Sequence, residues 1–179
     1  MPDWLQAIDW TALHWIRDTL HCGFLDLLLP AITALGNGGI IWLIAAAALS
    51  VSKKYRKYGI VLFAALAAGA LAGNVCLKPL IARARPCWLE SAPLLIASPT
   101  DYSFPSGHTL SSVIGACILT AADRRFVFAA VPTAVLIAFS RLYLYVHFPS
   151  DVLAAALIGI LIGTAAIRLM KAWIRRQER

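Results

Sequence analysis

The stretch KYGIVLFAALAAGALAGNVCLKPL, residues 57–80, decides the fold of this chain. Between Lys57 and Lys78 it carries no charged side chain, and about 20 consecutive apolar residues are enough for a helix to cross a bilayer. Four further apolar blocks repeat the pattern, at roughly 39–52, 106–122, 126–146 and 150–170. The chain is therefore expected to be all-α, a polytopic transmembrane helical bundle of about five to six membrane helices.

The composition agrees with a membrane protein. Of the 179 residues, 60% are hydrophobic and only 14% are charged, and the mean hydropathy is +0.75. A soluble domain is closer to half apolar and about a quarter charged. At this length we expect one domain, residues 1–179, in which residues 39–179 form the core bundle.

Residues 1–38 are expected to lie at the membrane interface. The segment 3–20 predicts an amphipathic helix whose tryptophans suit that position, with Asp9 as an interruption of its apolar face. The next apolar run, 24–35, is short for a span. We interpret it as a second interfacial or partly inserted helix that ends at the glycine-rich residues 36–39. The acidic N-terminus predicts no cleavable signal peptide.

The basic residues predict an orientation. Most of the 16 Lys and Arg residues gather in three clusters, at 53–57, 124–125 and 168–179. Basic clusters between apolar segments are typical of cytoplasmic loops, so the C-terminus is expected inside and the N-terminus outside. Nucleic-acid binding is the alternative interpretation of the net charge of +7, and this distribution disfavours it.

The four cysteines show no C-x-x-C spacing, which indicates no zinc site. Cys22 and Cys87 are both expected outside, where a disulfide is chemically feasible, although the sequence does not pair them.

Three short motifs fall at the outer ends of the expected spans. They are Lys78-x6-Arg85-Pro86, Pro105-Ser106-Gly107-His108 and Ser140-Arg141-x5-His147-x3-Asp151. An arginine fork matches the oxygens of a phosphate, and a lysine adds a mobile charge. The alternative is that these cations merely extend from helix ends toward water.

The second motif opens a span. Pro105 and Ser106 suit a helix start, Gly107 permits a close backbone approach, and free amides there favour an anion. His108 would lie at the rim of that anion site, where a proton donor is useful. An ordinary capped helix start with an interfacial histidine is the competing interpretation.

The third motif places a histidine and a carboxylate four residues apart. Asp151 could then hold one imidazole nitrogen of His147 and leave the other free to attack. The alternative is a surface histidine with an acidic residue in a first helical turn. Ionisable residues at membrane depth favour the functional interpretation.

Together the motifs resemble the three-part signature of the type-2 phosphatidic acid phosphatase superfamily, with every fixed position present over roughly residues 74–151. The family usually has six core helices, whereas this chain offers five full spans plus the N-terminal pair. The resemblance implies that His147 is a nucleophile that forms a phosphohistidine, that Asp151 orients it, and that His108 is the general acid.

The resemblance also implies a phosphate-binding set, made of Lys78, Arg85, Arg141, Ser106 and the amide of Gly107. Arg83 lies off the signature and is a candidate auxiliary phosphate contact. No metal and no other cofactor is expected, because cations and a helix start can supply the positive charge.

We therefore expect an integral lipid phosphatase of a bacterial cytoplasmic membrane, with its active site outside and lipid phosphates and membrane lipids as its partners. Undecaprenyl diphosphate is the favoured substrate, and phosphatidylglycerophosphate or phosphatidic acid come next. The alternatives from other classes are a non-enzymatic lipid-phosphate carrier and a vanadate-dependent oxidase.

Overall fold

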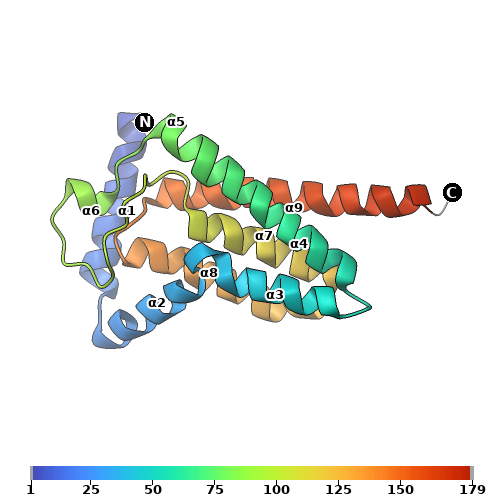
Figure 1. Cartoon of the computed structure of the whole chain (residues 1–179). Coiled ribbons are helices and arrows are strands. Elements are labelled where there is room, and N and C mark those ends of the chain that lie inside the picture. Colours follow the sequence, from blue (N-terminus) through green and yellow to red (C-terminus); the bar gives the residue numbers. More distant parts are fainter. Residues whose placement is uncertain (1, 178–179) are drawn as a thin grey trace.

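The computed structural model describes residues 2–177, and these residues form helices and connecting loops without a strand (Figure 1). The main helices are α1 (Asp3–Leu20), α2 (Gly23–Leu35), α3 (Ile40–Val51), α4 (Arg56–Ala70), α5 (Lys78–Ile81), α6 (Pro86–Leu89), α7 (Gly107–Ala122), α8 (Val127–Tyr143) and α9 (Pro149–Gln177). Three short elements join them, η1 (Asn37–Gly39), η2 (Leu71–Leu77) and η3 (Arg124–Phe126). The all-α expectation is confirmed.

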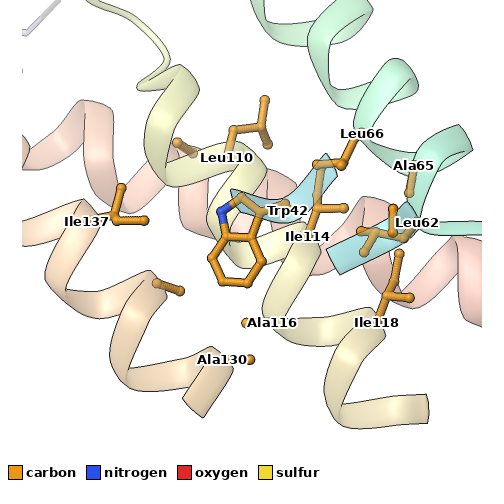
Figure 2. Packing of buried hydrophobic residues seen from close by; sticks show 13 residues of the cluster. Trp42, Leu62, Ala65, Leu66, Leu110, Ile114, Ala116, Ile118, Ala130 and Ile137 are labelled. Carbon is orange, nitrogen blue, oxygen red and sulfur yellow. The ribbon is translucent and has the colours of Figure 1, made fainter. Parts of the chain in front are cut away.

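Helix α7 is the centre of the bundle, because it packs against α4, α8 and α9. The core at its flank surrounds Trp42 of α3, as Figure 2 shows. Gly115 makes room for that indole, since a Cβ there would lie 2.3 Å from Trp42 Cε3. The indole N–H donates to Ser112 Oγ at 3.0 Å, so the buried ring has a polar partner.

Three helical segments are long and apolar enough to cross a membrane, namely Arg56–Leu89, Arg124–Tyr143 and Pro149–Gln177. Helices α2 and α3 meet at a bend of 44°, and as a pair they meet the same criterion. The expected span at 39–52 is therefore only the second half of a bent unit that begins with the run 24–35. Helix α7, with 16 residues, is shorter than a usual span.

Helix α1 confirms the amphipathic helix expected over residues 3–20. Trp4, Ile8 and Trp15 are exposed, whereas Asp9 and Leu13 are buried. Asp9 therefore belongs to the contact face of the helix rather than interrupting its lipid face. Helix α1 packs against α8 and α9. In Figure 1 it lies at one end of the bundle, opposite the C-terminal end of α9.

The four cysteines are free thiols, including Cys22 and Cys87.

Candidate active site

The three motifs meet in one cavity of about 620 Å³. All three contribute to its lining, with Lys78, Arg85, Gly107, His108, Arg141 and His147, and polar residues outside the motifs, among them Asn37, Asn74 and Asp101, line it as well. Ser106 and Asp151 are fully buried just behind this lining. The remaining wall is largely apolar, with Leu66 and Ala70 of α4 and Leu110 and Ile114 of α7.

His147 is buried at the wall of the cavity. Its Nε2 lies 3.1 Å from Nη1 of Arg85, which can only donate, so Nε2 carries the lone pair. Its Nδ1 then carries the hydrogen and lies 3.4 Å from Ser103 Oγ. Burial lowers the pKa of His147 to about 3, and the charges of Arg85 and Arg141 add to this effect, which outweighs the opposite pull of Asp151. The imidazole is therefore neutral, with a lone pair on Nε2.

Asp151 reaches His147 through a third residue. The direct distance from His147 Nδ1 to Asp151 Oδ2 is 3.8 Å, which is too long for a hydrogen bond. Ser103 fills the gap, because its hydroxyl donates to Asp151 Oδ2 at 2.5 Å. The same carboxylate oxygen accepts the backbone N–H of Phe148 at 3.0 Å. Asp151 therefore contacts His147 through the hydroxyl of Ser103, an arrangement that we call the relay. The sequence did not predict a role for Ser103.

Arg83 lies outside the cavity lining. Its Nη1 donates to Asp151 Oδ1 at 2.6 Å, and its Nη2 donates to Asp9 Oδ2 at 2.6 Å. The guanidinium also stacks on the Phe148 ring, with its central carbon 3.9 Å from the ring centroid. The candidate role of Arg83 as an auxiliary phosphate contact has no support from this placement, since both amino groups are engaged elsewhere.

Two of the cavity cations share a carboxylate that the motif analysis did not identify. Asp101 binds Lys78 through Oδ2, and its Oδ1 accepts from Arg85 Nη2 at 2.7 Å. Burial alone would raise the pKa of Asp101, but Lys78 and Arg85 outweigh it and lower that pKa to about 2. The carboxylate therefore stays charged and neutralises part of the cation set.

Arg141 is the third cation of the cavity. Its Nη1 donates to Thr33 Oγ1 of α2 at 2.7 Å. Among the residues that the structure describes, its buried Nε has no hydrogen-bond partner. Arg141 therefore retains a donor for an anion.

The second motif forms the helix start that the sequence predicts. Helix α7 begins at Gly107, and Ser106 caps it by accepting the Thr109 hydroxyl at 3.0 Å and the Thr109 amide at 3.5 Å. A Cβ at Gly107 would lie 3.3 Å from Asn74 Oδ1, so the backbone approaches its neighbour closely. The first turn of a helix leaves amides for an anion.

His108 is held by the break between α2 and α3. Its Nε2 lies 3.0 Å from Asn37 Oδ1, and a Cβ at Gly36 would lie 2.7 Å from His108 Cδ2. Gly38 and Gly39 have φ of 58° and 72°, which favour glycine. Gly36 and Asn37, in the stretch that the sequence predicts as a helix end, therefore lie against His108.

Comparison with known proteins agrees with this geometry. Residues 57–175 match the PAP2 superfamily. An undecaprenyl-diphosphatase of Sulfolobus acidocaldarius is 34% identical over 131 residues, which cover 72% of this chain and 63% of that protein, less than two thirds of its length. Phosphatidylglycerophosphatase B of Bacillus subtilis is 30% identical over 168 residues, which cover 83% of this chain and 72% of that protein.

Solved structures share the fold. A PAP2-type phosphatidylglycerolphosphate phosphatase from Bacillus subtilis has a TM-score of 0.77 at 25% identity, covering 98% of this chain and 88% of that one. LpxE of Aquifex aeolicus has a TM-score of 0.79 at 26% identity, covering 90% and 95%. With its apolar helices and its match over residues 57–175, this chain is an integral membrane protein that belongs to the PAP2 superfamily.

Proposed function

We propose that this protein is a lipid phosphatase that cleaves a lipid phosphate or diphosphate through a phosphohistidine on Nε2 of His147. The observation that carries the proposal is the placement of His147 in the wall of a cavity that Lys78, Arg85 and Arg141 also line, with its Nε2 3.1 Å from Nη1 of Arg85. A buried nucleophile beside three cations suits attack on a phosphorus whose oxygens those cations hold.

The reaction proceeds in two steps. Nε2 of His147 attacks phosphorus, a P–N bond forms, and the P–O bond to the leaving oxygen breaks while His108 gives that oxygen a proton. A water molecule then attacks phosphorus and gives its proton to His108, and the P–N bond breaks to release inorganic phosphate. Asp151, through Ser103, stabilises the charge that develops on the imidazole. The cations and the first turn of α7 bind the phosphate oxygens, so the mechanism needs no metal.

The cavity supports a lipid substrate. Its charged end lies where the three motifs meet, and its apolar wall is formed by α4 and α7, with Pro30 and Ala34 of α2. A phosphate on an apolar tail matches this division. We favour undecaprenyl diphosphate, as the name of the Sulfolobus relative suggests. Phosphatidylglycerophosphate is the second candidate, because the fold of the phosphatidylglycerolphosphate phosphatase from Bacillus subtilis matches 98% of this chain.

The basic clusters at 53–57, 124–125 and 168–179 support an active site on the outer face of the membrane. Cysteine labelling in a cysteine-free background tests this orientation. Ser91→Cys should react with an impermeant reagent in intact cells, whereas Lys54→Cys should react only after lysis. The reverse pattern would invert the proposed orientation.

Phosphate release by the purified protein without added metal tests the activity. The panel is undecaprenyl diphosphate, phosphatidylglycerophosphate, phosphatidic acid and a soluble phosphomonoester. We expect His147→Ala to abolish release and the matched control His14→Ala to retain it, because His14 pairs with Glu90 outside the cavity.

Three results would contradict the proposal. Binding of lipid without release would favour the carrier, and halide oxidation with vanadate would favour the oxidase. Full activity of His147→Ala would refute the nucleophile assignment.

A further inference from the structure

A chain of buried polar side chains links the N-terminal helix to the nucleophile. Asp9 of α1 binds Arg83 at 2.6 Å, Arg83 binds Asp151 at 2.6 Å, and Ser103 connects Asp151 to His147. Asp9, Arg83 and Asp151 are 1%, 8% and 0% exposed. Charged side chains are almost never this buried unless they are paired.

Asp9 is fixed at both oxygens. Its Oδ1 accepts the backbone N–H of Ser150 at 2.9 Å, and its Oδ2 accepts the Ser150 hydroxyl at 2.5 Å as well as Arg83. Ser150 directly precedes Asp151 in the first turn of α9. Helix α1 therefore contacts the Asp151 turn both through the backbone of α9 and through the guanidinium of Arg83.

Helix α1 lies outside residues 57–175, the part of the chain that matches the superfamily. The network therefore connects an N-terminal element beyond that match with the carboxylate behind the nucleophile. Buried ion pairs give little net stability but cost much when one partner is removed. A stabilising role alone would be served as well by apolar contacts such as that of Leu13, which is fully buried on the same helix.

We propose that Arg83 and Asp9 are positioning residues for catalysis: Asp9 holds the guanidinium fork of Arg83, and this fork fixes Asp151. The inference rests on the proposed phosphohistidine mechanism. One amino group of Arg83 contacts each carboxylate, so the fork sets the separation of Asp9 and Asp151. Docking of α1 thereby sets the position of the relay that ends at Nδ1 of His147.

The charge balance gives the network a second effect. Two carboxylates and one guanidinium leave one negative charge beside His147, and attack by Nε2 makes the imidazole ring positive. The network therefore stabilises the ring when it carries the phosphoryl group. Without Arg83 the two carboxylates would face each other without a cation between them, and Asp151 would lose the partner that fixes it. Without Asp9, the positive charge of Arg83 would act on Asp151 alone.

The test compares kcat and KM for phosphate release, with kcat calculated per vanadate-binding site so that unfolded protein is not counted. We expect Asp9→Asn to lower kcat by about 10-fold to about 100-fold, with KM within about twofold, because the cavity cations stay in place. The matched control is Asp18→Asn on the same helix, whose side chain is 68% exposed, and it should match the wild type.

Two further variants make the test specific. Arg83→Lys keeps a charge but has no fork, so it should lose less kcat than Arg83→Gln. In the Arg83→Gln background, Asp9→Asn should have almost no further effect, because residues of one network are not additive. If Asp9→Asn gives no folded protein, kcat and KM are compared instead for the Arg83 variants and for Ser150→Ala. Ser150→Ala removes the hydroxyl that lies between Arg83 and Asp9.

The outcomes separate the two proposals. Fewer vanadate sites with unchanged kcat per site would show that the network only stabilises the fold and would overturn this inference. Equal loss in Arg83→Lys and Arg83→Gln, or full additivity with Asp9→Asn, would also overturn it. A wild-type protein that releases no phosphate in a His147-dependent manner would instead refute the proposed function.

Discussion

Replacing Ser103 with alanine removes the hydroxyl that lies between Asp151 and His147. The Ser103 hydroxyl lies 2.5 Å from Asp151 Oδ2 and 3.4 Å from His147 Nδ1, whereas the direct distance between those two atoms is 3.8 Å. Ser103→Ala should therefore leave Nδ1–H of His147 without an acceptor, while Asp151 keeps its hydrogen bonds from Arg83 and the Phe148 amide and the cavity cations stay in place.

The structure sets the size of the effect. An N–H···O hydrogen bond is about 2.9 Å long, so Asp151 or the ring must move by about 1 Å to restore a direct bond. A misplacement of about 1 Å costs up to about 100-fold in rate, which is about 2.7 kcal/mol. Because partial movement into the vacated space recovers some of the contact, we expect kcat to fall by about 10-fold to about 100-fold.

The assay follows phosphate formation in a single turnover with enzyme in excess. The measured rate is then that of the chemical steps and is not limited by dissociation of the product. The matched control is Ser112→Ala, which removes another fully buried hydroxyl and leaves the indole N–H of Trp42 without its acceptor. That variant should lose about 1–3 kcal/mol of stability and keep its rate. A Ser103→Ala rate within twofold of the wild type would refute the relay.

Three further predictions follow from the cavity. Asp101→Asn should lower the Ki of inorganic phosphate by up to about fivefold, because it frees the two cations that this carboxylate neutralises. An unchanged Ki would show that Asp101 does not compete with phosphate for these cations. Gly36→Ala places a Cβ 2.7 Å from the His108 ring and should lower kcat about 10-fold, whereas Gly23→Ala, in open space, should not. Since the pKa of His147 is lowered from 6.5 to about 3 by burial, its ring should stay neutral as the pH falls to about 4; a midpoint between pH 6 and 7 in its NMR signals would contradict this.

The cations and histidines of the cavity could be predicted from the sequence because they stand at the ends of spans. Lys78, Arg85, His108, Arg141 and His147 all line one cavity. In a membrane bundle consecutive spans run in opposite directions. The end of one span and the start of the next therefore lie at the same membrane face, and motifs at these ends lie close together. The positions of the motifs at span ends are therefore enough to predict that their side chains meet.

The supporting residues could not be predicted in the same way. Ser103 acts through its position between two other side chains, and a serine in a loop carries no periodic signal. Asp101 differs from other loop acids only in the cations that it meets in space. Asp9 did give a signal, since a carboxylate on an otherwise apolar helix face suggests a buried partner, but that partner is 74 residues away in the chain.

The length of α7 explains why the site needs these supports. Its 16 residues give a helix about 24 Å long, whereas the hydrocarbon core is about 30 Å thick. A helix of this length does not reach both boundaries of that core, so we expect Ser106 and Gly107, and the phosphate proposed to bind there, to lie inside the bundle. Polar side chains that are buried behind the cavity are shielded from water and must be satisfied by other groups of the protein. The buried network of Asp9, Arg83 and Asp151 meets this requirement, with α1 covering the end of the bundle where α9 begins.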